Sequence, residues 1–230
     1  MVRSESYSPP RDRQTSSRSA EILEAARDLF ARNGYESTSV SDIAGAVGVA
    51  DGAIYRHFPS KRAVLYEVIR EFYEPVIVMA KGNIAGIGDV RQRLRYLIWL
   101  QVRAFTEQPE LCRLIIAEAR PMEDYYESEI ADLNRRYTSL LVEVVQDGQT
   151  HGTFRDDVEP TMVRDLVYGG IEHIAWGAVT GRSEIDPNVI ADDLTRLICT
   201  GLDASGTQES ESGLAAQVAR LETLVDRMKP

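Results

Sequence analysis

Apolar residues recur at helical spacing along almost the whole chain, and this periodicity most restricts what the chain can fold into. Beyond residue 85, segments with apolar side chains three and four residues apart are separated by Gly and Pro. No segment alternates apolar and polar residues as a half-buried strand would. The pattern therefore predicts an all-α fold with five helices in this part, at about 89–107, 109–119, 122–149, 160–180 and 187–203.

Two shorter helical patterns stand near the N-terminus. The first is an amphipathic helix with an expected N-cap at Ser16 or Ser17, and it ends near Gly34, where glycine allows a left-handed cap. Ser39 and Asp42 then have the spacing of a capping box, in which each side chain satisfies a backbone N–H of the helix start. We therefore expect a second, short helix to begin at Ser39.

A third short segment and a long helix follow a tight glycine turn. The third segment covers residues 51–58 and places Ile54 and Phe58 on its inner side, four residues apart. The long helix starts after Ser60, and Pro75 is expected to kink or interrupt it. Two short helices joined by a tight turn, with a helix before and a long helix after, predict a helix-turn-helix head.

Charge is distributed unevenly between this head and the rest of the chain. The whole chain of 230 residues has a formal net charge of −10. Residues 1–70 contain 10 Lys and Arg against 9 Asp and Glu, whereas residues 71–230 contain 16 against 27. A near-neutral head on an acidic body agrees with a head that approaches a polyanion and a body that does not.

The head resembles the DNA-binding domain of the TetR family of bacterial regulators. Residues 20–72 carry the resemblance, above all NGYESTSV at residues 33–40 and GAIYRHFPSK at residues 52–61. The resemblance implies an all-α homodimer with a three-helix DNA-binding head and a larger helical domain for ligand binding and dimerisation. Such a dimer binds a palindromic operator on double-stranded DNA and releases it when a small molecule enters the larger domain.

Residue roles follow from the resemblance at the matching positions. Thr38 and Ser39 match residues that hydrogen-bond phosphate, as a helix start favours, and Lys61 matches a further phosphate contact. Arg56 stands where the family often has another polar or aromatic residue, and its guanidinium has the geometry to bind guanine through two hydrogen bonds. The implied DNA-binding residues are Thr38, Ser39, Gly52, Ala53, Tyr55, Arg56, His57 and Lys61.

Asp51 departs from the family pattern, in which this position is frequently basic or polar. Phosphate would repel its carboxylate, unless Asp51 caps the third helix or accepts a hydrogen bond from a cytosine amine. Of these two roles, the cap is the preferred interpretation.

The second half of the chain is expected to provide the dimer contact. Residues 168–178 are apolar with several small residues, which permits close helix packing. In TetR-family proteins the last two helices of the larger domain form a four-helix bundle with their counterparts across a two-fold axis. By position, these would be the helices at about 160–180 and 187–203. Glu172 and His173 lie inside this apolar run as a structural pair at the interface, or else His173 orients a ligand.

The effector pocket is expected among the middle helices, lined by apolar and aromatic side chains. For each candidate, core packing or simple exposure is the alternative role. The family resemblance and the aromatic residues favour an apolar ligand, such as a fatty acid, an acyl-CoA or a hydrophobic drug. The candidate residues are Trp99, Arg103, Phe105, Tyr125, Tyr126, Tyr137, His173 and Trp176.

Other functional classes find little support. The chain has no glycine-rich phosphate loop, no nucleophile elbow and no paired metal-ligand motif, so we expect no catalytic, metal or cofactor site. The two cysteines are interpreted as reduced core thiols. A helical ligand-binding or adaptor protein without DNA binding, and an activator in place of a repressor, remain the alternatives.

The chain divides into four expected parts. A disordered tail covers residues 1–16, the DNA-binding head 17–70 and the ligand-binding and dimerisation domain 71–204. Residues 205–230 provide a linker and an amphipathic C-terminal helix with coiled-coil spacing at 214–229. No secretory leader and no membrane span is visible, so a cytoplasmic location is expected.

Overall fold

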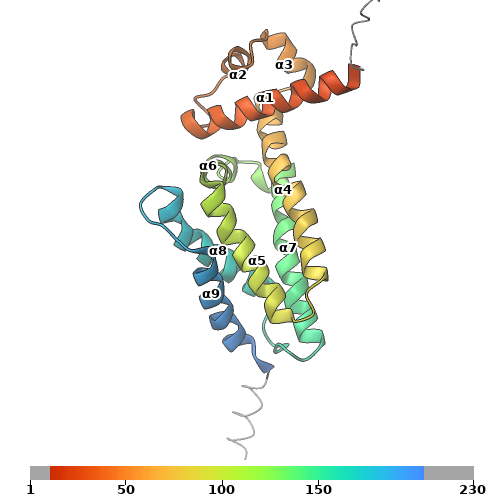
Figure 1. The fold of residues 1–230 in the computed structure, drawn as a ribbon, viewed down its shortest axis with the longest axis vertical. Helices are drawn as coiled ribbons and strands as arrows, with labels where there is room; N and C mark the ends of the chain where they lie inside the picture. Colours follow the sequence, from red (N-terminus) through yellow and green to blue (C-terminus); the bar gives the residue numbers. More distant parts are fainter. Residues whose placement is uncertain (1–10, 205–230) are drawn as a thin grey trace, which may run out of the picture. The chain divides into compact units, whose positions relative to one another are not determined.

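The structure is a computed structural model that describes residues 11–204, with side chains from Arg18 onward. Within this range the chain is helical, without a β-strand, which confirms the all-α fold (Figure 1). The expected C-terminal helix lies outside the described residues. The helices are α1 (Arg11–Asn33), α2 (Val40–Ala46), α3 (Asp51–His57), α4 (Lys61–Ala85), α5 (Val90–Glu107), α6 (Pro109–Arg113), a π-helix (Leu114–Ala119), a 3-10 helix (Tyr125–Glu127), α7 (Glu129–Thr150), α8 (Pro160–Val179) and α9 (Pro187–Leu202).

The described residues form two compact units. The first unit contains residues 11–79 and 108–137, and the second contains residues 80–107 and 138–204. Helices α4 and α7 each contribute residues to both units. None of the described helices is long and apolar enough to cross a membrane.

Helix α1 begins at Arg11, earlier than the N-cap expected at Ser16 or Ser17. It starts directly after Pro9 and Pro10 in the sequence, and the residues that follow include the good helix formers Arg and Gln. The two serines therefore lie within the helix, because nothing between Arg11 and Ser17 breaks it.

Helix α7 begins later than expected, at Glu129. The Ser128 hydroxyl accepts a hydrogen bond from the backbone N–H of Ala131 at 3.2 Å, so Ser128 caps the helix. The preceding residues form turns and the 3-10 helix. The expected start at residue 122 is wrong because this local cap fixes the start at Glu129.

Helix α4 continues through Pro75, so of the two expected outcomes, a kink or an interruption, the interruption is excluded. The residues just before the proline are held against α7: the Tyr73 hydroxyl hydrogen-bonds the side-chain oxygen of Asn134 at 3.2 Å, and Glu74 pairs with Arg136 at 2.7 Å. The Arg136 guanidinium also lowers the pKa of Glu74. These contacts favour helical geometry where proline alone disfavours it.

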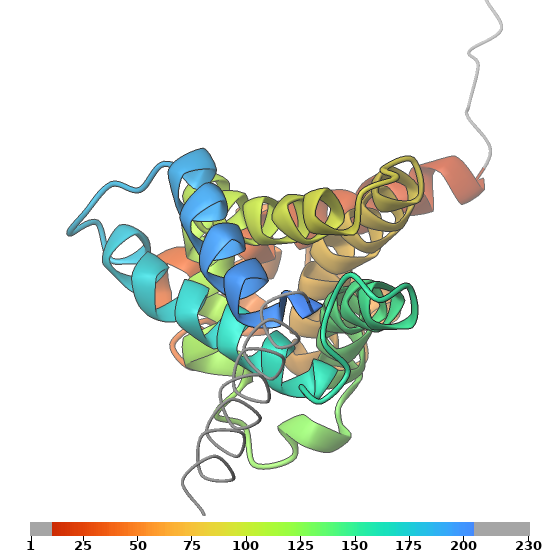
Figure 2. The same cartoon turned by 90° about the horizontal axis from the view of Figure 1, so that it is seen from below.

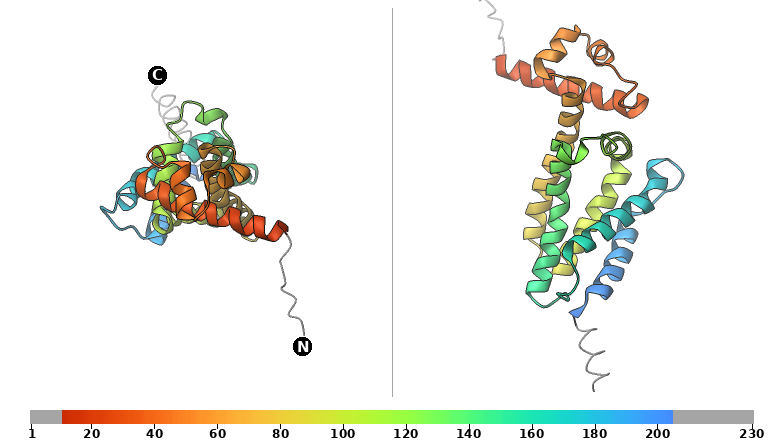
Figure 3. Two further views of the ribbon diagram at one scale, coloured as in Figure 1. Left: turned by 90° about the horizontal axis from the view of Figure 1, so that it is seen from above. Right: turned by 180° about the vertical axis from the view of Figure 1, so that it is seen from behind.

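The apolar faces of α1, α2 and α3 together form the core of the head. Helix α2 packs against α1 and against α3, and both short helices lie on the same side of α1 (Figures 1 and 3). The apolar faces predicted for these helices are buried, which confirms the spacing argument. Their buried residues include Ile22, Leu23, Ala26 and Phe30 of α1, Val40, Ile43 and Ala44 of α2, and Ile54 of α3.

In the second unit, α5 packs against both α8 and α9 (Figure 2). The apolar side of α5 is buried, and two arginines on α5 add polar ties towards α9. Arg95 pairs with Asp192 at 2.6 Å, and Arg91 pairs with Asp203 at 3.2 Å. The Arg95 contact lowers the pKa of Asp192. Burial supplies most of the stability here, because half-exposed ion pairs contribute little.

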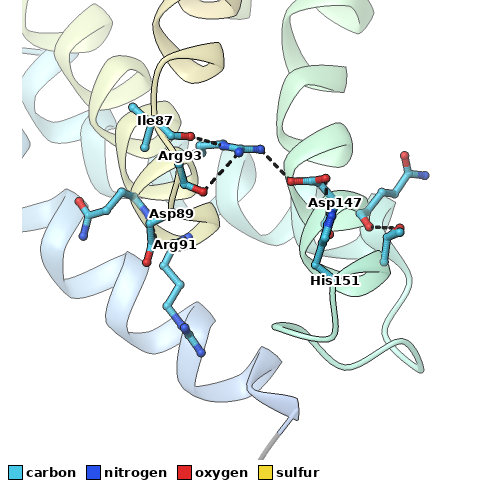
Figure 4. A network of polar contacts seen from close by, with 10 residues as sticks. Ile87, Asp89, Arg91, Arg93, Asp147 and His151 are labelled. Carbon is cyan, nitrogen blue, oxygen red and sulfur yellow. Dashed lines mark hydrogen bonds and ion pairs between the residues drawn. The ribbon is translucent and has the colours of Figure 1, made fainter.

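A polar network joins the start of α5 to the end of α7 (Figure 4). The Arg93 guanidinium donates to the carbonyl oxygens of Ile87 at 2.6 Å and Gly88 at 3.4 Å, and it pairs with Asp147 at 2.7 Å. Nδ1 of His151 lies 3.2 Å from the same carboxylate. Arg93 therefore donates to two loop carbonyls and ties the loop to α7.

Both cysteines are buried and neither is in a disulfide, as expected. Burial raises the pKa of the Cys112 thiol to about 12. At neutral pH this thiol is therefore protonated and unreactive.

Gly148 provides a test of core packing in the second unit. A methyl group at this position would lie 2.2 Å from Cδ2 of Phe154, whose side chain is fully buried. We expect Gly148→Ala to lower the free energy of unfolding by about 1–3 kcal/mol, because a close-packed core cannot absorb the clash. Urea denaturation measures the change.

Gly82→Ala is the matched control, since Gly82 lies in α4 with nothing within 4 Å of the added carbon. This variant should be as stable as the original protein or up to about 1 kcal/mol more stable, as helix propensity favours Ala over Gly. An equal loss of stability in both variants would contradict the packing explanation.

Candidate nucleic-acid interface

The helix-turn-helix begins at the capping box that the sequence predicts. The Ser39 hydroxyl accepts from the backbone N–H of Asp42 at 3.1 Å, and the Asp42 carboxylate accepts from the backbone N–H of Ser39 at 2.8 Å. Hydrogen bonds from Ser39 also lower the pKa of Asp42. Because both groups are used within the protein, the cap defines where α2 starts.

The turn between α2 and α3 depends on Gly48. Its φ of 68° lies in the left-handed region, which glycine adopts without strain. Directly after it, the backbone N–H of Val49 donates to the carbonyl of Ala44 at 3.0 Å and closes the end of α2. This tight closure sets the direction in which α3 leaves.

Helix α3 has one buried face and one exposed face. Ile54 and the capping residue Phe58 are buried, whereas Tyr55 is 53% exposed and Arg56 is exposed beside it. Gly52 lies one turn before Arg56, also exposed, with nothing within 4 Å of an added Cβ. The protein itself does not require a glycine there, so the open space is available to an outside surface. Of the other expected contacts, Ala53 and His57 are half-buried.

Thr38 holds the loop between α1 and α2 and does not face outward. Its side chain is 1% exposed, and its hydroxyl donates to the carbonyl oxygens of Gly34 at 2.9 Å and Leu29 at 3.3 Å. The expectation that this hydroxyl binds phosphate is therefore corrected. The hydroxyl is buried, and it already donates within the loop. A threonine before a capping box gave no indication of this role.

Lys61 also contacts the loop between α1 and α2. Its ammonium group donates to the carbonyl oxygens of Tyr35 at 2.8 Å and Glu36 at 3.3 Å, and it lies 4.2 Å from the centre of the Tyr35 ring. Sequence reasoning missed these contacts, since the partners lie 25 and 26 residues away. In this structure Lys61 therefore stabilises the loop, whatever part it takes in phosphate binding.

Asp51 does not cap α3, contrary to the preferred interpretation of the sequence. The N-cap is Ala50, which has no side-chain cap, and Asp51 is the first residue of the helix. Its carboxylate accepts a hydrogen bond from the Ser41 hydroxyl on α2. Asp51 does not take the N-cap position because α3 begins one residue earlier than a capping aspartate requires.

The expected effector residues are divided between the two units. In the second unit, Trp99 and Arg103 lie together, with the guanidinium carbon of Arg103 5.0 Å from the Trp99 ring centre, and Phe105 is buried in the core. Also in this unit, His173 and Trp176 are exposed on α8. Exposure of His173 favours a surface role over a ligand contact.

The remaining effector candidates belong to the first unit. Tyr137 is buried and its ring centre lies 5.8 Å from that of Tyr73, which is a core contact. Tyr126 is exposed. Tyr125 is buried, and its hydroxyl has no hydrogen-bond partner among the described residues, so it is the candidate with an unsatisfied polar group.

The first unit also contains a cavity that the sequence did not indicate. It has a volume of about 250 Å³ and lies between α1, α4 and the start of α6. None of the expected effector residues lines it. Its walls are Leu23, Arg27, Val68, Glu71, Phe72, Pro75, Val76, Gln108 and Leu111.

Helices α8 and α9 expose several large apolar side chains. On α8, Leu166 is 63% exposed, and Gly169 and Gly170 have open space beside them. On α9, Leu197 is 68% exposed. Met162, Ile174, Trp176 and Val189 share this exposure. An apolar surface with small residues is typical of a protein contact.

Lys61→Met tests the loop contact, because methionine keeps the apolar stem and removes the charged donor. We expect the loop to lose about 1.5 kcal/mol of stability, the lower end for a charged donor, because Lys61 is half-exposed. Hydrogen–deuterium exchange of residues 34–39 should become faster. Lys81→Met removes the same charge from an exposed position of α4 and should leave this exchange unchanged. Equal effects of the two variants would contradict the assigned contact.

Two segments of the chain match known family patterns. Residues 22–68 match "Bacterial regulatory proteins, tetR family", and residues 88–202 match "Tetracyclin repressor-like, C-terminal domain". The first match contains α2, α3 and their turn, and the second contains α5 to α9.

Individual relatives agree with these matches. The chain is 29% identical over 167 residues to the HTH-type transcriptional repressor KstR2 of Mycobacterium tuberculosis, covering 72% of this chain and 82% of that protein. It is 22% identical over 182 residues to the fatty acid metabolism regulator protein of Bacillus subtilis, covering 79% and 94%. Among solved structures, FadR of Bacillus subtilis in complex with stearoyl-CoA has a TM-score of 0.72 at 22% identity, covering 80% and 98%. The chain belongs to the TetR family of bacterial regulatory proteins.

Proposed function

We propose that this protein is a ligand-responsive transcriptional repressor that acts as a homodimer on a palindromic operator and leaves it when an apolar small molecule binds. The exposed face of α3 carries the proposal. Gly52, Tyr55 and Arg56 are exposed there, on a helix whose other face is fixed by Ile54 and Phe58. A recognition helix needs this arrangement to enter the major groove in one orientation.

The proposed DNA contacts are divided between bases and phosphates. Arg56 has the donor geometry for guanine, and the open space at Gly52 permits close approach to the groove. Ser39 at the start of α2 contributes an exposed helix end for phosphate. Ala53, Tyr55 and His57 complete the set, while the hydroxyl of Thr38 is left out of it.

The proposed dimer contact is the apolar surface of α8 and α9. Half-sites on an operator lie about one helical turn, roughly 34 Å, or a multiple apart, so two heads must be held together. The exposed side chains on these helices are the described groups best suited to that contact, because burying them removes apolar area from water. His173 is exposed on α8, which supports a place for it at the dimer contact.

The proposed effector is an apolar or amphipathic molecule such as a fatty acid or an acyl-CoA. Two similar proteins support this class: a fatty acid metabolism regulator of Bacillus subtilis, and FadR of Bacillus subtilis, whose structure holds stearoyl-CoA. Helix α4 contributes residues to both units, so it offers a covalent route by which binding in one unit affects the other. Whether the protein represses or activates depends on where its operator lies relative to the promoter. The proposed place of action is the cytoplasm.

A gel-shift titration with DNA upstream of its own coding sequence tests the proposal. The full-length protein should bind one segment of this DNA in the presence of competitor. Arg56→Ala combined with Tyr55→Ala should weaken binding at least about tenfold, because these two exposed side chains face the groove. Stearoyl-CoA or stearic acid should weaken the original complex by about 5- to 150-fold.

Coenzyme A alone is the control for the acyl chain, and it should leave the complex intact. Binding of stearoyl-CoA without binding of any DNA would instead favour the ligand-binding or adaptor protein. If neither the DNA nor any acyl compound binds, the proposed function fails in both parts.

The dimer contact is tested by placing charges on the exposed apolar surface. Leu166→Glu combined with Leu197→Glu should convert the dimer to a monomer in sedimentation experiments, because the interface would then bury unpaired carboxylates. Val78→Glu is the matched control, since Val78 on α4 is 68% exposed, as Leu197 is. Loss of the dimer in this control but not in the double variant would place the contact elsewhere.

A further inference from the structure

We propose that Asp51 is a specificity-determining residue that accepts a hydrogen bond from the exocyclic amine of a cytosine in each half-site. The inference rests on the proposed DNA binding and goes beyond the contact residues assigned above. Its starting point is the juxtaposition of Asp51 at the start of α3 and Ser41 on α2.

Asp51 lies at the N-terminal end of the recognition helix. It is the first residue of α3, it is exposed, and Tyr55 follows four residues later on the same face of the helix. In a helix-turn-helix protein the N-terminal residues of the recognition helix are the ones that reach base edges. Asp51 therefore stands where a side chain meets bases.

The negative charge of Asp51 is unusual for a residue that lies close to DNA. A carboxylate beside the phosphate backbone is repelled, and the chain does not use this one as a helix cap. If Asp51 served only to stabilise the head, the hydrogen bond from the Ser41 hydroxyl would be its whole function. An ionised carboxylate has about four acceptor positions, so one hydrogen bond from Ser41 leaves others open.

The chemistry of the groove selects the base. An ionised carboxylate only accepts hydrogen bonds, and the major groove offers two donors, the N4 amine of cytosine and the N6 amine of adenine. The adenine amine lies beside the acceptor N7, which repels a carboxylate, whereas cytosine presents no acceptor on that edge. Guanine and thymine present acceptors. Asp51 should therefore favour cytosine and disfavour the other three bases.

Ser41 acts as a positioning residue in this arrangement. Its hydroxyl, fixed on α2 behind the capping box, donates to the carboxylate and restricts the rotation of the Asp51 side chain. A restricted acceptor discriminates between bases better than a mobile one, because less conformational freedom is lost on binding.

Selection of binding sequences from random duplex DNA by the full-length protein tests the inference, and it works with an operator of any sequence. The original protein should select a palindrome with cytosine at one position of each half-site. Asp51→Asn should replace this cytosine with adenine at both symmetry-related positions, since an amide matches the N6 donor and N7 acceptor of adenine. Measured on defined duplexes, the cytosine preference should fall by about 5- to 150-fold per half-site.

Two further variants separate base reading from other effects. Ser41→Ala should keep cytosine as the preferred base but reduce its preference, since the acceptor remains and its positioning is lost. Glu24→Gln removes the same charge as Asp51→Asn from an exposed position of α1 and should leave every base preference unchanged.

The outcomes distinguish the inference from the proposed function. If the original protein selects a palindrome and Asp51→Asn selects the same sequence, with all affinities changed alike, then Asp51 only ties α2 to α3 and the inference falls alone. If the original protein selects no sequence, the inference falls together with the proposed function.

Discussion

The burial of one face of α3 is the constraint on which the rest of the head depends. Ile54 and Phe58 are almost completely removed from water, and burying side chains of this size contributes roughly 1.5–3 kcal/mol each. A seven-residue helix has no stability in isolation, so this burial is what keeps α3 helical. The same burial orients Tyr55 and Arg56 outward. Stability and recognition in the head therefore have a common physical origin.

Polar groups then hold the loops that the apolar core leaves open. Thr38 and Lys61 both donate to carbonyl oxygens between α1 and α2, and the Ser39 cap follows directly. Each of these carbonyls would otherwise need a partner, because backbone groups that lose water are costly to leave unsatisfied. Thr38 and Lys61, to which the family resemblance assigns phosphate contacts, therefore stabilise the head itself. Arg93 has the same part in the second unit, where it joins the loop before α5 to α7.

Much of the fold could be predicted because it depends on local patterns. The capping box at Ser39, the inward pair Ile54 and Phe58, and the apolar face of α5 all follow from spacing, and the structure confirms them. The start of α7 was missed because its cap at Ser128 stands among other polar residues. The sequence could not decide between a kink and an interruption of α4 at Pro75, because the contacts that hold this part of the helix come from α7, which is distant in sequence. The candidate site was predicted less completely: its outward residues were found, but the burial of Thr38 and the contacts of Lys61 and Asp51 were not.

The sequence by itself determined that the chain is helical, that a helix-turn-helix stands near its N-terminus, and which face of α3 is outward. These properties depend on periodicity and on residues three or four apart, which the chain displays directly. Only the tertiary structure decided that Thr38 points inward, that Lys61 binds the loop between α1 and α2, and that Ser41 rather than a helix end holds Asp51. The physical reason is the same in each case. A polar side chain takes the partner that folding brings near it, and that partner is not encoded in the local spacing.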